Sequence, residues 1–133
     1  MRTITWNDDD QVIEMIDQRL LPQEFKINQY HNYKDVANAI RSMVIRGAPA
    51  IGAAAAYGMA LAAINSNAEG VHVLVKDLKT AGETLNKSRP TAVNLSWAVK
   101  RMLGQADGFK GSVDELRVAL LEKAKSIAAE DVK

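Results

Sequence analysis

The stretch that decides the fold covers residues 45–65 and reads IRGAPAIGAAAAYGMALAAIN. Pro49 has its φ angle fixed near the helical value and lacks an N–H group, so it suits the first position of a helix. Gly47 can adopt backbone angles closed to other residues, which lets successive N–H groups point into one concavity. The sequence therefore predicts a loop that turns into a helix at Pro49, and a helix that runs to about Asn65.

The charge at this junction suggests a binding role. A helix N-terminus carries free N–H groups and a partial positive charge, and Arg46 adds a permanently charged fork. Arg46 and Gly47 are therefore candidates for binding a phosphate or a carboxylate. The alternative is a purely structural role. Glycine and proline are common at the boundary between a loop and a helix, and the arginine could simply cap a neighbouring carbonyl group.

The predicted helix is apolar on every side, since no charged residue lies between Arg46 and Glu69. A membrane span is one interpretation, but alanine and glycine give little transfer free energy per residue. Small side chains instead let neighbouring helices approach closely, so we expect the central helix of a soluble bundle. The small residues concerned are Gly52, Ala53, Ala56, Gly58, Ala60 and Ala63.

A second stretch, residues 87–98, reads KSRPTAVNLSWA and repeats the order of arginine, proline and apolar helix. We expect a helix over 90–102, with a cap hydroxyl from Ser88 or Thr91. Two helix starts with an arginine suggest two N-termini that converge on one ligand. Arg89 is therefore a further candidate binding residue.

These two strings, in this order and spacing, resemble the methylthioribose-1-phosphate isomerase family. The opening segment resembles the same family through Trp6, Asp17-Gln18 and Leu21-Pro22. The wider superfamily includes regulatory subunits of the translation-initiation guanine-nucleotide exchange factor and ribose-1,5-bisphosphate isomerases, but the two strings favour the methylthioribose branch. The resemblance implies that Arg46, Gly47, Ala48 and Arg89 bind the substrate.

The implied activity is the aldose–ketose isomerisation of 5-methylthioribose 1-phosphate to 5-methylthioribulose 1-phosphate in methionine salvage. It is an intramolecular oxidoreduction, and the resemblance implies no metal or organic cofactor. Members of the family are longer than this chain, and their second half is a Rossmann-like domain with a catalytic cysteine and aspartate. This chain has no cysteine and stops at Lys133 inside a predicted helix. We therefore expect an N-terminal substrate-binding domain that has no catalytic residue and is inactive alone.

The implied partners are the sugar phosphate, the C-terminal catalytic domain and, in the complete protein, a second copy in a homodimer. Two other functions stay open. A chain without the catalytic half also fits a non-enzymatic regulatory or assembly module related to the exchange-factor subunits. The third interpretation is a helical domain whose arginines are purely structural.

Composition further limits the classes of partner and of site that the chain can have. A length of 133 residues suits one domain, and the net charge of +1 gives no basic footprint for nucleic acid or an anionic membrane. The absence of cysteine excludes disulfides and thiolate metal sites. No apolar signal segment follows Met1, so the cytoplasm is the default location.

We expect an α+β fold, mostly α, in a single domain over 1–133. Residues 1–31 predict a small antiparallel sheet of about three strands, and residues 32–133 predict a bundle of about five helices. Helices are expected over 33–43, 49–65 and 90–102, and another from the capping box at Ser112-Val113-Asp114-Glu115. Apolar spacing at Leu74, Leu78, Ala81 and Leu85 indicates a helix between them, although the alternation at Val71, Val73 and Val75 also fits a strand.

The remaining polar and aromatic residues predict no chemistry. His31 and His72 have no partner at the spacing of metal ligands, so we expect them to be structural or exposed. The aspartates at 8–10 fit a solvated hairpin turn better than a metal site. Tyr57, inside the apolar helix, is expected in the core, and Trp6 and Trp97 in core or interdomain packing.

Overall fold

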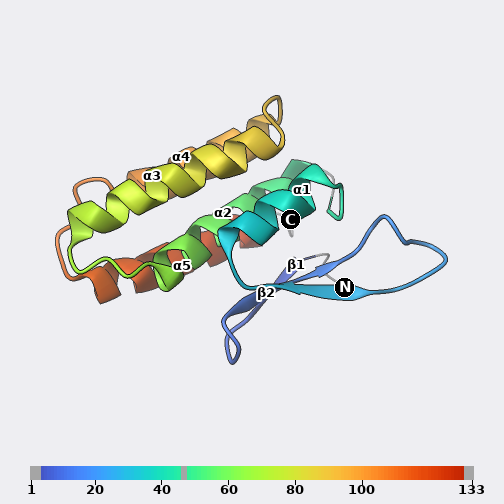
Figure 1. Ribbon diagram of the computed structural model, residues 1–133, viewed down its shortest axis with the longest axis horizontal. Coiled ribbons are helices and arrows are strands. Elements are labelled where there is room, and N and C mark those ends of the chain that lie inside the picture. The colour runs from blue at the N-terminus through green and yellow to red at the C-terminus, as the bar shows by residue number, and fades with distance from the viewer. Residues whose placement is uncertain (1–3, 46–47, 131–133) are drawn as a thin grey trace.

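A three-stranded antiparallel sheet opens the chain in the computed structural model, which describes residues 4–45 and 48–130 (Figure 1). Strands β1 (Ile4–Asn7), β2 (Val12–Ile16) and β3 (Ile27–Tyr30) follow one another in the order β1-β2-β3. Trp6 pairs with Ile13, and Met15 pairs with Asn28. The predicted sheet is confirmed.

Five helices follow the sheet in the described part of the chain. They are α1 (Tyr33–Arg41), α2 (Ala48–Asn65), α3 (Val71–Ser88), α4 (Val93–Ala106) and α5 (Val113–Glu130). The sheet lies to one side of these helices (Figure 1). This architecture confirms the predicted α+β, mostly helical class. No helix in the described ranges is both long enough and apolar enough to cross a membrane.

Helix α2 is the central element, as its composition predicts. Every residue from 50 to 63 is buried, and α2 packs against each of the other four helices. A methyl group built on Gly58 would lie 3.2 Å from both Leu85 methyl carbons and 3.3 Å from Val36 Cγ1. Small side chains in α2 therefore set how closely its neighbours approach.

Helix α1 is shorter than the spacing of its apolar residues predicts. Asn32 caps its start by accepting a hydrogen bond from the Asp35 N–H at 2.9 Å, and the helix ends at Arg41. Met43, expected inside the helix, has a φ of +64°, in the left-handed region that non-glycine residues rarely adopt. The chain reverses there and leads toward α2.

The start of α4 corrects one prediction. The helix begins at Val93 rather than at Pro90, and its cap residue, Ala92, makes no side-chain hydrogen bond to it. Neither Ser88 nor Thr91 caps it, because Ser88 ends α3 and its hydroxyl donates to the Leu85 carbonyl group. Proline is compatible with a helix start but equally with the turn that precedes one.

The structures of α3 and α5 test two further predictions, the helix-or-strand alternative at residues 71–75 and the capping box at Ser112. Residues 71–75 lie in the first turns of α3, so the helical alternative is correct, and Leu74, Leu78, Ala81 and Leu85 are buried. The capping box of α5 forms as predicted: the Glu115 N–H donates to Ser112 Oγ, and Glu115 Oε1 accepts from the Ser112 N–H.

Contacts from α5 tie it to the end of α2 and to the sheet. Arg117 donates from Nε to the Ala63 carbonyl oxygen at 2.9 Å and from Nη2 to the Ser66 carbonyl oxygen at 2.7 Å. Lys125 forms an ion pair with Asp8 in the β1–β2 turn. The Arg117 contacts therefore hold the start of α5 against the end of α2, and the Lys125 ion pair holds α5 to the sheet.

The sheet is held against α2 by aromatic stacking. Trp6 of β1 stacks on Tyr57 with 5.7 Å between ring centroids and 5° between planes. Tyr57 is 3% exposed, so its predicted core position is confirmed.

Candidate functional site

The start of α2 is where the anion-binding turn was predicted. Ala48 and Pro49 are the first two residues of this helix. Arg46, Gly47 and the side chain of Ala48 lie outside the described residues. The geometry of the site is therefore built from the residues around this helix start.

The two arginine-containing strings meet at the first turns of α2. A methyl group built on Gly52 would lie 3.4 Å from the main-chain oxygen of Asn94 and 3.7 Å from Asn94 Cβ. The absence of a side chain at Gly52 lets the start of α4 lie directly against α2. Segments about forty residues apart in sequence thus come together here.

A hollow of about 290 Å³ opens beside this contact. It is bounded by the first turns of α2, the first turns of α4 and the end of α5. Trp97 of α4 forms part of its wall and is 52% exposed, so it is not a core residue. The lining residues are Pro49, Gly52, Asn94, Trp97, Ala98, Ile127 and Glu130.

Trp97 also carries a cation on its ring, which the sequence analysis missed. The Cζ atom of Arg101 lies 4.5 Å from the centroid of the Trp97 ring, and Arg101 also forms an ion pair with Glu130. The signal in the sequence was the spacing of four between tryptophan and arginine, which places both on one helix face.

A larger hollow, of about 510 Å³, lies at the opposite end of α2. Ala62, Asn65 and Ser66 contribute to its wall. Two polar groups of its wall bond within the chain: the Ser66 hydroxyl donates to Asp77 at 2.6 Å, and the Asn65 amide donates to the His31 carbonyl group. We therefore place the candidate site at the smaller hollow.

Arg89 lies directly after α3, in the turn that leads to α4. It is the C-cap residue of α3, and its carbonyl oxygen accepts a hydrogen bond from the Ala92 N–H at 3.0 Å. Its Nη1 atom is buried and has no hydrogen-bond partner within the described part of the chain; the same holds for Oδ1 of Asn86, one turn earlier. A buried polar group without a partner costs ~1–3 kcal/mol. Arg89 thus carries a donor without a partner among the described residues, but it is not one of the residues that line the smaller hollow.

The other residues considered at the sequence level bring no further chemistry to this place. His31 and His72 are exposed, as expected. Asp8 and Asp10 make hydrogen bonds within the β1–β2 turn region. Across residues 4–45 and 48–130, no group of three acidic or histidine side chains is placed to hold a metal ion.

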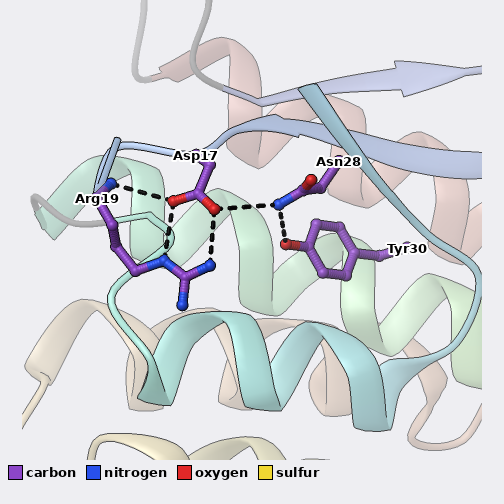
Figure 2. Close-up of polar contacts among 4 residues, drawn as sticks. All are labelled: Asp17, Arg19, Asn28 and Tyr30. Carbon is purple, nitrogen blue, oxygen red and sulfur yellow. Dashed lines mark hydrogen bonds and ion pairs between the residues drawn. The ribbon is translucent and has the colours of Figure 1, made fainter. Parts of the chain in front are cut away.

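A buried carboxylate at the end of β2 is the main feature that sequence reasoning missed. Asp17 is 2% exposed, and Figure 2 shows its side chain between Arg19 and Asn28. Its Oδ1 accepts from Arg19 N–H at 3.1 Å and from Arg19 Nε at 2.9 Å. Its Oδ2 accepts from Arg19 Nη2 at 2.7 Å and from Asn28 Nδ2 at 3.4 Å. Asn28 in turn donates to the Tyr30 hydroxyl at 3.2 Å.

This network predicts a specific dependence of stability on pH. Hydrogen bonds from Arg19 lower the pKa of Asp17 below its ordinary value of 3.8, although burial acts in the opposite direction. Because the folded pKa is below the unfolded one, the stabilisation is complete above the unfolded pKa and is lost as pH falls through the folded pKa.

We expect Asp17→Asn to lower the free energy of unfolding at pH 7, and we expect the difference from the parent chain to shrink below about pH 4. Urea unfolding at pH 7, 4 and 3 measures this difference. Asp9→Asn, at an exposed position of the β1–β2 turn, is the control and should change stability little at any of these pH values. An equal difference at pH 7 and pH 3 would contradict the expectation.

The chain belongs to the Initiation factor 2 subunit family, whose sequence pattern matches residues 44–133. A putative methylthioribose-1-phosphate isomerase of Methanosarcina acetivorans is 44% identical over 133 residues, which are 99% of this chain and 38% of that protein. The 5-methylthioribose 1-phosphate isomerase of Pyrococcus horikoshii OT3 superposes with a TM-score of 0.90 at 40% identity, over 97% of this chain and 36% of that one.

A second solved structure is equally similar. The translation initiation factor eIF-2B subunit delta of A. fulgidus also has a TM-score of 0.90, at 39% identity, over 99% of this chain and 38% of that one. The chain thus spans between about a third and two fifths of the length of these relatives. The comparisons confirm the resemblance on which the sequence analysis relied.

Proposed function

We propose that this chain is the substrate-binding part of an aldose–ketose isomerase that converts 5-methylthioribose 1-phosphate to 5-methylthioribulose 1-phosphate in methionine salvage. The observation that carries the proposal is the meeting of the two strings at Gly52 and Asn94. The buried Nη1 donor of Arg89, which has no partner among the described residues, and the names of the relatives support it.

In this proposal, Arg46, Gly47, Ala48 and Arg89 hold the phosphate group. The phosphate on the anomeric carbon prevents the sugar ring from opening spontaneously. The complete site must protonate the ring oxygen and then move hydrogen from carbon 2 to carbon 1, away from bulk water. Firm orientation of the phosphate supplies part of the rate, and this is the contribution of the chain. We assign no catalytic residue to it.

The acid–base chemistry belongs to a C-terminal catalytic domain of the same protein, which we propose to be a cytoplasmic homodimer. The full-length protein in this proposal has the length of the relatives and carries this chain. The single-domain boundaries proposed for the chain are 1–133, with the sheet over 1–31 and the bundle over 32–133.

We expect the 133-residue chain to bind 5-methylthioribose 1-phosphate weakly and not to isomerise it, because it holds the phosphate without an acid–base group. Titration calorimetry measures the binding, and proton NMR of the sugar measures the conversion. Detectable turnover by the isolated chain would contradict the assignment of catalysis to another domain.

A second candidate function is a regulatory or assembly module of a translation-initiation exchange factor. The observation in its favour is the equal structural similarity to the A. fulgidus protein described as eIF-2B subunit delta. Affinity purification of the full-length protein from its own cells distinguishes the two functions. A co-purifying exchange-factor subunit, with no sugar-phosphate binding, would favour the regulatory module.

A further inference from the structure

The main chain around Asp17 is joined to the segment that leads into α2. The Gln18 N–H donates to the Val44 carbonyl oxygen at 2.8 Å, while the Val44 N–H donates to the Ala39 carbonyl oxygen at 3.0 Å. Val44 is therefore held from two sides, by α1 and by the turn at Asp17. It lies four residues before the first residue of α2.

The segment between α1 and α2 depends on such external contacts for its shape. Met43 has a φ of +64°, a conformation that costs ~1–3 kcal/mol and persists only when the surroundings fix it. Val44 and Ile45 directly after it are buried, at 4% and 0% exposure. The bond from Gln18 is one of the contacts that fix this strained connection.

The position of the Gln18 N–H is set in turn by its two neighbours. Asp17 donates its N–H to the Lys26 carbonyl oxygen at 2.8 Å and accepts from the Leu20 N–H at 3.2 Å. The Arg19 side chain folds back and joins the Asp17 carboxylate through Nε and Nη2 (Figure 2). The two residues on either side of Gln18 are therefore held together. The Arg19 side chain is 49% exposed, while that of Asp17 is 3% exposed.

We propose that the Asp17–Arg19 pair positions the start of α2 by orienting the Gln18 N–H toward Val44. The inference rests on the function proposed above, because that function places the substrate at the start of α2, the element whose position the pair would set. Asp17 and Arg19 are positioning residues: they act through Gln18 and Val44, and we assign them no contact with the substrate.

The direct test uses Arg19→Gln in the 133-residue chain, with hydrogen exchange of the Gln18 amide followed by NMR. Losing the guanidinium contacts to the Asp17 carboxylate should speed this exchange by about tenfold or more, because the turn at residues 17–19 opens more often. The control is Arg117→Gln, which removes another arginine that ties α2 to a neighbour, at the opposite end of that helix. It should leave the Gln18 amide unchanged.

The functional test uses the same two variants in the full-length protein. Arg19→Gln should raise the KM for 5-methylthioribose 1-phosphate about threefold to tenfold, because misplacing a binding group weakens orientation. Arg19→Lys, which keeps the charge but not the fork, should recover part of the loss. Arg117→Gln should leave the KM unchanged even where it lowers the melting temperature.

The two readouts separate the failure of this inference from that of the proposed function. Unchanged exchange at Gln18 in Arg19→Gln overturns the positioning role, whatever the enzyme does. Equal increases of KM in Arg19→Gln and Arg117→Gln overturn it too, because they would reflect stability alone. A full-length protein that neither binds nor converts the sugar phosphate overturns the proposed function and, with it, the consequence drawn for the turn.

Discussion

Replacing Arg89 with alanine in the full-length protein should raise the KM for 5-methylthioribose 1-phosphate roughly 10- to 150-fold, because a hydrogen bond to a charged group contributes ~1.5–3 kcal/mol. The same change should leave the melting temperature of the 133-residue chain unchanged or raise it. The reason is that Nη1 of Arg89 is buried without a partner among the described residues, so truncation removes an unfavourable group.

The pairing of these two effects distinguishes a binding arginine from a structural one. An arginine that only ties helix ends together would lower stability when removed and leave the KM alone. Arg89→Lys should fall between parent and alanine variant, since lysine keeps the charge but cannot form the planar fork. Arg41→Ala removes an exposed arginine of α1 and controls for the general loss of positive charge.

Replacing Leu85 with alanine should lower the free energy of unfolding by ~2–5 kcal/mol, which is the usual cost of truncating a fully buried leucine. Leu85 is 0% exposed, and both its methyl groups face Gly58 of α2. Urea unfolding of the 133-residue chain, followed by circular dichroism, measures the loss.

The contact between Gly58 and Leu85 allows a further test with a double variant. Gly58→Ala alone places a methyl group 3.2 Å from the Leu85 methyls, so packing strain opposes the gain in helix propensity. Combined with Leu85→Ala, the same methyl group fills part of the vacated space, and the double variant should be more stable than Leu85→Ala alone. Gly104→Ala has nothing within 4 Å and isolates the propensity effect, a gain of up to about 1 kcal/mol. Additive effects of the two substitutions would contradict this description of the contact.

The helices were predictable where composition and spacing agreed. The apolar stretch that forms α2 has no charge to expose, and the capping box at Ser112 has one simple geometry, so both formed as expected. Residues 71–75 were ambiguous because an alternation of valines fits a strand, and packing of Leu74 and Leu78 against the bundle decided for the helix.

The predictions that failed, and the network that was missed, depend on features that the local sequence does not show. Met43 continues the apolar periodicity of α1, yet its backbone turns left-handed because the chain must reverse toward α2. Pro90 marks a turn and not a helix start, which local sequence cannot distinguish. The Asp17 network includes a hydrogen bond between residues eleven positions apart across a loop, so no local sequence pattern predicts it.

The composition of α2 also has a consequence for the entropy of binding. Alanine, glycine and proline have almost no side-chain rotamers to lose, whether on folding or when a ligand arrives. The first turn of α2 consists of Ala48, Pro49, Ala50 and Ile51. A ligand that docks there would contact main-chain groups that the helix has already ordered. The helical part of such a site loses little conformational freedom on binding, so the cost of ordering comes mainly from the arginine side chains.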